Sequence, residues 1–297
     1  MASNRSKLFY FFLRLINKKR FLKRQFSLGR FDFFTCPKPP SEVFASCRVT
    51  ETRLNGQSVF TLTPQQNGSD KHILYLHGGA YVMGFVKQHW RFLALLVEQL
   101  KCTITAPDYP LAPKFTYSES FAMVVPLYKE LVAKVGTGNF ILMGDSAGGG
   151  FALALAQKMR EERVAQPDQV ILLSPWLDIT LTNPDINAID PLDPFLGIEG
   201  LQRAGKAYAG SAQPDHYLLS PVNGPLEGLG KISLFIGSRE ILAADARKLK
   251  QRAESQGIHL NYYEYEEMFH VWMLLNLPES RKARRQIMEL IRGGSIP

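Results

Sequence analysis

The residues best suited to chemistry lie in Gly-Asp-Ser-Ala-Gly, residues 144–148. Residues 139–143 before this motif read as a buried strand, and the residues after it read as a helix. The turn between them needs small residues at Gly144 and Gly148, and it lifts the Ser146 hydroxyl off the sheet. It also directs the Ala147 N–H and the helix N-terminus at developing negative charge. The motif therefore predicts that Ser146 is a nucleophile.

A second group of small residues, His77-Gly78-Gly79-Ala80, closes a predicted strand. Consecutive small residues let a backbone loop approach a ligand and present N–H groups to it. We expect the Gly79 and Ala80 N–H groups, with that of Ala147, to form an oxyanion hole. His77 ends the strand and is interpreted as a structural residue.

A serine nucleophile needs a histidine base and a carboxylate that orients the base. Where the serine lies on a strand–turn–helix motif of this kind, the acid follows it in the chain and the histidine comes last. Of the six histidines, only His270 follows the last predicted strand. The acid must follow the strand at 231–236, where the candidates are Glu240 and Asp245. We favour Glu240, because it lies directly after the strand end, and retain Asp245 as the alternative.

Strand-like and helix-like segments alternate along the chain. This alternation predicts an α/β fold with a mostly parallel eight-stranded sheet and helices on both faces. Asn55-Gly56 predicts that the sheet opens with an antiparallel hairpin. The expected strands are 43–49, 58–63, 72–76, 102–106, 139–143, 169–174, 231–236 and 260–265, and the expected helices are 87–100, 118–134, 147–163, 240–256 and 279–292.

Several motifs in this order resemble the hormone-sensitive-lipase-like branch of the α/β-hydrolase fold. The resemblance covers about residues 70–292 and rests on HGGA (77–80), DYPLAPK (108–114), GDSAGGG (144–150), LSPWLD (173–178), GSREIL (237–242) and MFHVW (268–272). It implies a serine esterase for short-to-medium acyl chains, without metal or organic cofactor. It also implies a cap made of an N-terminal segment, residues 1–40, and an insertion at about 178–215 in the catalytic domain, residues 41–297.

The chain departs from this family pattern at three places. The family usually has Asp where Glu240 stands, and often Arg and Glu where this chain has Pro110 and Lys114. Ala80 replaces the third glycine of the loop. We expect any ion pair that braces the loop in relatives to be absent or rebuilt here.

The expected activity is therefore hydrolysis of a small-molecule ester through an acyl-enzyme. An amidase or peptidase using the same three residues remains an alternative, as does a relative that binds a ligand without catalysis. The sequence leaves a homo-oligomer open.

The net charge of +8 belongs to residues 1–35, which carry nine basic side chains and one acid. The rest of the chain is neutral, which argues against nucleic-acid binding, because such binding needs basic charge spread over the fold. This segment could serve as a weak membrane-surface contact; we favour a cap helix with its aromatic side over the pocket. Residues 164–202 carry six acids and no Lys or Arg, so opposite charges are expected to dock the two cap pieces.

Three cysteines give no disulfide framework, and the expectation is a cytoplasmic protein, with a peripheral place at the membrane as the alternative. The apolar run at 8–16 contains Arg14 and is too short to cross a bilayer, so neither a signal peptide nor a transmembrane helix is expected.

Overall fold

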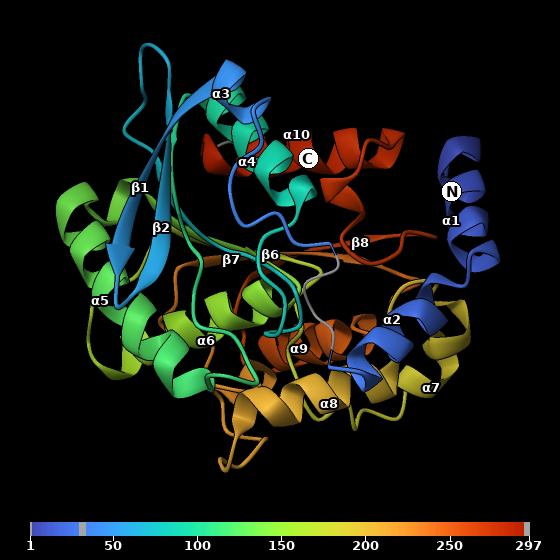
Figure 1. Ribbon diagram of the computed structural model, residues 1–297. Coiled ribbons are helices and arrows are strands. Elements are labelled where there is room, and N and C mark those ends of the chain that lie inside the picture. The colour runs from blue at the N-terminus through green and yellow to red at the C-terminus, as the bar shows by residue number, and fades with distance from the viewer. Residues whose placement is uncertain (1, 30–33, 294–297) are drawn as a thin grey trace.

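The alternating segments assemble around one eight-stranded sheet with the order β1-β2-β4-β3-β5-β6-β7-β8 (Figure 1). The structure, a computed structural model, describes residues 2–29 and 34–293. Strands β1 and β2 form the expected antiparallel hairpin, β2 also pairs antiparallel with β4, and the remaining pairs are parallel. The strands are β1 (Cys47–Leu54), β2 (Gln57–Pro64), β3 (His72–Leu76), β4 (Thr103–Pro107), β5 (Phe140–Asp145), β6 (Gln169–Leu173), β7 (Lys231–Gly237) and β8 (Leu260–Tyr265).

Helices cover both faces of the sheet, as expected. The central strands are apolar on both faces: Ile73 and Tyr75 join one core, whereas Leu74 and Leu76 join the other. Helices α4 and α10 cover the first face and α5, α6, α8 and α9 the second (Figure 1). Their bounds are α4 (Lys87–Leu100), α5 (Tyr117–Val135), α6 (Ala147–Glu161), α8 (Ile198–Ala209), α9 (Ala243–Ser255) and α10 (Pro278–Ile291).

The first expected strand was misplaced. Residues 43–46 form the short helix α3 (Val43–Ser46), and β1 begins only at Cys47. Turn hydrogen bonds from Val43 N to Pro40 O and from Phe44 N to Ser41 O start this helix, and Val43 is buried. The β-branched and aromatic residues that suggested a strand therefore pack as a helical turn against α4.

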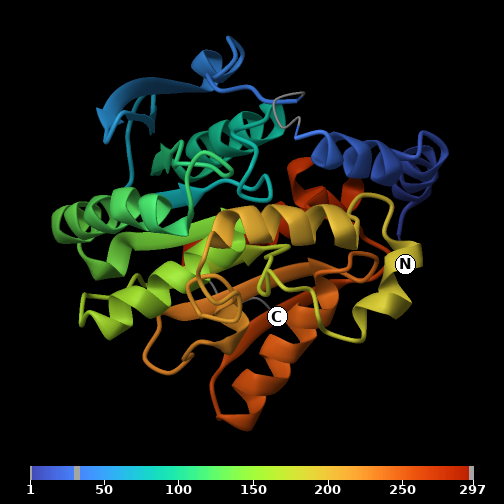
Figure 2. The same ribbon diagram turned by 60° about the horizontal axis from the view of Figure 1, so that its bottom comes forward.

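Two segments far apart in sequence lie together beside the sheet. The first comprises α1 (Asn4–Leu15) and α2 (Lys18–Ser27). The second, within residues 178–215, comprises α7 (Ile186–Ile189), the 3-10 turn η2 (Asp190–Leu192) and α8. Helix α2 packs against α8, and Figure 2 shows the N-terminal helices next to this insertion.

One ion pair joins these two segments among the described residues. Lys19 Nζ lies 2.6 Å from an Asp190 carboxylate oxygen and also donates to the Asp190 carbonyl. The Tyr10 hydroxyl donates to Leu192 O at 2.8 Å. Among the described residues, the expected attraction between the basic segment and the acid-rich stretch is seen at Asp190. None of the described helices combines the length and apolarity that a membrane span requires.

Candidate active site

Ser146 occupies a strained turn between β5 and α6. Its φ of 53° lies in the left-handed region, which costs a non-glycine residue about 1–3 kcal/mol. Surrounding backbone hydrogen bonds hold it there: Ser146 N donates to Leu173 O, and Trp176 N donates to Ser146 O, both at 2.8 Å. A Cβ on Gly148 would lie 2.0 Å from Leu76 O, so this turn requires glycine at that position, as the sequence predicts.

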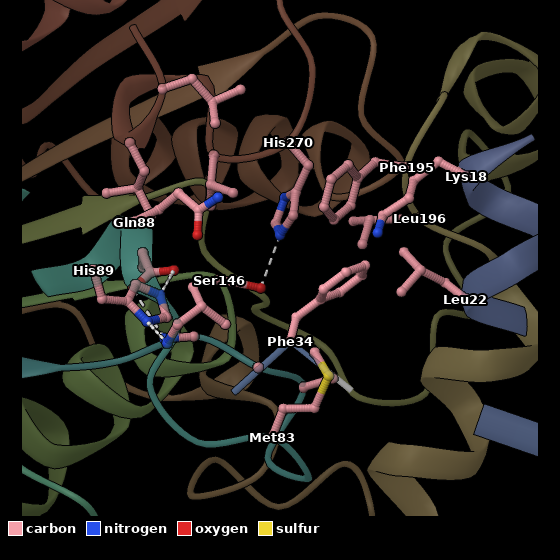
Figure 3. Close-up of a pocket in the computed structure, with 18 of the residues that line it drawn as sticks. Lys18, Leu22, Phe34, Met83, Gln88, His89, Ser146, Phe195, Leu196 and His270 are labelled. Carbon is pink, nitrogen blue, oxygen red and sulfur yellow. Dashed lines mark hydrogen bonds and ion pairs between the residues drawn. The ribbon is translucent and has the colours of Figure 1, made fainter. Parts of the chain in front are cut away.

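The structure brings Ser146, His270 and Glu240 together in one hydrogen-bonded chain. Ser146 Oγ lies 2.9 Å from His270 Nε2, and His270 Nδ1 lies 2.6 Å from Glu240 Oε2 (Figure 3). His270 is 4% exposed and Glu240 is fully buried. This arrangement allows the imidazole to take the hydroxyl proton while the carboxylate holds the opposite ring nitrogen.

Glu240 is placed by its other carboxylate oxygen. Oε1 accepts hydrogen bonds from Gly237 N at 2.8 Å and from Ser174 Oγ at 2.7 Å. Ser174 also accepts from Val271 N at 3.1 Å, so one hydroxyl joins the acid to the backbone beside His270. The sequence analysis missed Ser174; its position directly after β6, between β5 and β7, was the available signal.

Asp245, the alternative acid, lies elsewhere. Its Oδ1 accepts from Asn183 Nδ2 at 3.0 Å, and its Oδ2 has no hydrogen-bond partner among the described residues. Burial raises the pKa of Asp245 to about 6. Asp245 therefore fastens α9 to the insertion, and Glu240 is the carboxylate against His270.

The loop at residues 78–80 lines the same cavity as Ser146. Gly79 and Ala80 both have positive φ, 128° and 55°, and Gly79 O accepts from Val82 N and Met83 N. Within the described structure, the N–H groups of Gly79, Ala80 and Ala147 donate to no protein acceptor. Ala80 adopts the left-handed conformation despite its Cβ, at a cost of about 1 kcal/mol.

A buried carboxylate supports this loop from below. Asp145 Oδ1 accepts from Gly78 N at 2.8 Å and from the Tyr75 hydroxyl at 2.6 Å, while His89 Nε2 lies 3.2 Å from Oδ2. Since His89 Nδ1 accepts from Val86 N, its proton lies on Nε2, toward Asp145. Burial alone would raise the pKa of Asp145, but His89 and the other donors hold it below its ordinary value.

The DYPLAPK segment braces the loop through Tyr109, a backbone hydrogen bond and Asp108, whose Oδ1 lies 3.6 Å from His77 Nε2. The Tyr109 hydroxyl donates to His77 O at 2.6 Å, and Ala112 N donates to Tyr81 O at 2.9 Å. The His77 ring stacks on Tyr109 with centroids 4.3 Å apart, and its Nδ1 lies 2.7 Å from Gly78 O. Lys114 is exposed. His77 thus contacts the loop that it was expected to hold, and the bracing is rebuilt from Tyr109, backbone groups and the His77–Asp108 contact.

A cavity of about 440 Å³ opens in front of Ser146. Its walls come from the loop at 78–80, from residues 195–201 of the insertion and from the N-terminal segment, whose lining residues are Phe9, Lys18, Leu22 and Phe34. Figure 3 shows Lys18 and Leu22 across the cavity from His89, with Ser146 and His270 between them. Lys18 Nζ lies 3.7 Å from the Phe34 ring centroid, and burial lowers the pKa of Lys18 to about 8.

Comparison with known proteins gives the same fold. Residues 73–274 match a family described as having the alpha/beta hydrolase fold. The chain is 30% identical to an esterase of Acinetobacter venetianus and 32% identical to an acetyl-hydrolase of Streptomyces hygroscopicus. These alignments cover 75% of each chain for the first, and 71% of this chain and 72% of the relative for the second.

Solved structures extend the likeness over nearly the whole chain. An esterase of the bacterial hormone-sensitive lipase family has a TM-score of 0.83 at 25% identity and covers 99% of both chains. An esterase/lipase from an uncultured bacterium has the same TM-score and identity, covering 98% of this chain and 99% of its own. With the motifs in the order that the sequence analysis described, the chain belongs to the alpha/beta hydrolase fold family, in its hormone-sensitive-lipase-like branch.

Proposed function

We propose that the protein is a serine carboxylesterase that hydrolyses short-to-medium acyl esters through an acyl-enzyme. The observation that carries the proposal is the chain from Ser146 through His270 to Glu240, beside a loop whose Gly79 and Ala80 N–H groups donate to no acceptor in the described structure. The names of the relatives, esterase and acetyl-hydrolase, support the same reaction class.

The first half of the reaction forms the acyl-enzyme. Ser146 Oγ attacks the ester carbonyl carbon as His270 Nε2 takes the hydroxyl proton. The Gly79, Ala80 and Ala147 N–H groups donate hydrogen bonds to the carbonyl oxygen as negative charge forms on it. The carbon–oxygen bond to the alcohol then breaks, and His270 returns its proton to the leaving oxygen.

Water completes the cycle by the same route. His270 takes a proton from water as the water oxygen attacks the acyl carbon, and the Ser146 oxygen leaves with that proton. Glu240 accepts the His270 Nδ1–H bond throughout and stabilises the charged imidazole. Ser174 Oγ and Gly237 N donate to the second oxygen of Glu240, so both carboxylate oxygens of this buried residue have hydrogen-bond partners.

The cavity supports a modest acyl group. Its apolar walls favour hydrocarbon, and its volume falls in the usual range for small-molecule sites. Two of its walls come from the N-terminal segment and the insertion, which together act as the proposed cap. Acyl-length preference therefore depends on how α2 packs against α8.

Rapid-mixing kinetics test the proposal. With p-nitrophenyl esters from acetyl to decanoyl, we expect a burst of p-nitrophenol equal to the enzyme concentration and a mass increase of one acyl group on Ser146. A matched p-nitroanilide separates esterase from amidase: equal rates on both would favour the amidase. Binding of the esters without any burst or turnover would identify a non-catalytic relative instead.

A further inference from the structure

Helix α1 presents two different faces. Ser6 and Leu13 are buried on the inner face, and Phe9 stacks on Phe269 with centroids 5.7 Å apart. The opposite face carries large apolar side chains at the i, i+3, i+4, i+7 spacing of a single helical stripe. This outer stripe consists of Leu8 (71% exposed), Phe11 (63%), Phe12 (50%) and Leu15 (73%), and Ile16 (48%) follows it.

The outer stripe is an unusual surface for this molecule. Of the ten large apolar side chains that are exposed among the described residues, eight lie between positions 8 and 34. Apart from Phe9, the aromatic residues of α1 do not line the pocket, contrary to a cap helix that turns its aromatic side inward. Clustered exposed apolar groups of this kind mark an interaction surface.

Polar contacts at its N-terminal end fix α1 to the body. Ala2 N donates to Glu267 at 2.9 Å, Ser3 N donates to Glu279, and the Ser6 hydroxyl also binds Glu279. Arg239 lies over the Tyr10 ring at 4.7 Å. Because the inner face is already docked, the outer stripe cannot fold into the core and remains available to a partner.

The charge around the stripe identifies the chemistry of that partner. Residues 1–35 hold nine basic side chains against one acid, in a chain that is otherwise neutral. Exposed cations border the stripe on α1 and continue along α2: Arg5, Lys7, Arg14, Arg20 and Arg24. A surface that combines acyl chains with anionic headgroups matches both features.

We propose that the outer stripe of α1 and its bordering cations dock this protein on an anionic phospholipid surface. A second copy of the chain fits less well, since a symmetric dimer through this face would bring two strongly basic segments together. Docking would also place the α1–α2 wall of the cavity at the lipid boundary. That last step rests on the proposed function, whereas the docking itself does not.

Vesicle co-sedimentation tests the docking directly. The full chain is mixed with vesicles of phosphatidylcholine alone or with about 30% phosphatidylglycerol. We expect pelleting with the anionic vesicles, and its loss at about 0.5 M salt. The stripe variant Leu8→Ser/Phe11→Ser/Leu15→Ser should lower the partition coefficient about 30-fold or more. The charge variant Arg5→Gln/Arg14→Gln/Arg20→Gln should lower it about 10-fold on anionic vesicles only.

Matched controls separate docking from damage to the fold. Phe44→Ser removes an equally exposed aromatic side chain from α3 and should pellet like the wild type. None of the three stripe positions lines the cavity, so the stripe variant should keep its melting temperature and its rate on a soluble ester, if that activity exists. A Phe12→Trp reporter should shift its emission to the blue with anionic vesicles, because its indole would move from water into the lipid boundary. The three native tryptophans are fully buried, so the shift would report on position 12.

Three results would overturn the proposal. Equal pelleting of the wild type and a folded stripe variant would show that the apolar stripe does not contribute to binding. Equal pelleting of the wild type with neutral and anionic vesicles would show that anionic lipid is not required. If the wild type bound no vesicles and formed a dimer that the stripe variant abolished in sedimentation velocity, the face would be a contact between copies.

Discussion

The carboxyl edge of the sheet and the N-terminal segment differ in how their side chains are held. At the sheet edge, Glu240 is fully buried, and both of its carboxylate oxygens have partners from β6, β7 and the His270 loop. In the N-terminal segment, most of one helix face is exposed, and Lys19–Asp190 is the ion pair to the insertion among the described residues.

This difference separates two tasks. A reaction needs groups fixed to within a fraction of an ångström, so its residues lie at strand ends and accept hydrogen bonds from several elements. A cover over the cavity has to admit substrate. Helix α1 is fixed to Glu267 and Glu279, whereas one partly exposed ion pair joins α2 to the insertion among the described residues. Changes at the sheet edge should therefore abolish activity, and changes in the segment should adjust specificity.

The largest expected effect follows from Ser146→Ala. Removing the nucleophile should lower kcat by about 10⁶, because no other hydroxyl is placed against His270 in the described structure. The measurement is p-nitrophenyl ester hydrolysis, with the exposed Ser211→Ala as the matched control. A Ser146→Ala enzyme that kept a tenth of the wild-type rate would show that Ser146 is not the nucleophile.

Glu240→Gln should reduce kcat by about 10⁴, since the amide holds the wrong imidazole tautomer while preserving shape. Asp245→Asn should change kcat less than ten-fold, because Asp245 binds Asn183 and not His270. The same ester assay compares the two variants. The reverse order of losses would show that Asp245 is the acid.

Gly148→Ala should destabilise the fold by about 3 kcal/mol, because the new Cβ would overlap Leu76 O. Gly138→Ala is the matched control, since no heavy atom lies within 4 Å of its Cβ position. Urea unfolding measures both free energies. Equal midpoints would show that the turn below Ser146 is more adaptable than its contacts indicate.

The pH dependence of stability should change in Asp245→Asn. Burial raises the pKa of Asp245 to about 6, above the ordinary value of 3.8, so the native state keeps this proton longer than the unfolded chain. Its contribution to stability is full below pH 3.8 and is lost as the pH rises to about 6.

Asp245→Asn should therefore gain about 2 kcal/mol of stability relative to wild type between pH 4.5 and 7.5. Urea unfolding of both proteins at the two pH values gives the difference. If the difference in unfolding free energy between the two proteins did not change with pH, the native-state pKa of Asp245 would equal its value in the unfolded chain.

The smallest effect should come from Lys19→Met at the cap contact. The Lys19–Asp190 ion pair is partly exposed, so its loss should lower the free energy of unfolding by about 0.5–1 kcal/mol. Added salt should weaken the same pair in the wild type. We expect a two- to three-fold change in KM for the longest acyl ester, as a marginal cap effect. Lys129→Met removes the remote pair with Glu162 and serves as the control. An identical acyl-length profile for Lys19→Met would make this pair a surface feature only.

Much of the fold and site could be predicted from the sequence because the signals are local. Buried strands such as β3 and β5 read as continuous apolar runs, and a helix at residues 87–100 was placed within its observed bounds. Residues 43–46 misled the same reasoning, since a short apolar run fits a strand or a helical turn.

The sequence by itself determined the turn at Ser146 and the run of small residues at 78–80 that lines the same cavity, because such backbone shapes demand small residues at fixed spacing. Only the tertiary structure decided that Glu240 faces His270, that Ser174 fastens Glu240, and that the apolar side of α1 turns outward. These outcomes depend on contacts between residues far apart in the chain, 97 positions for Ser174 and Val271 and 276 positions for Ser3 and Glu279. Local patterns carry no record of such contacts, because side-chain direction is set by packing between distant elements.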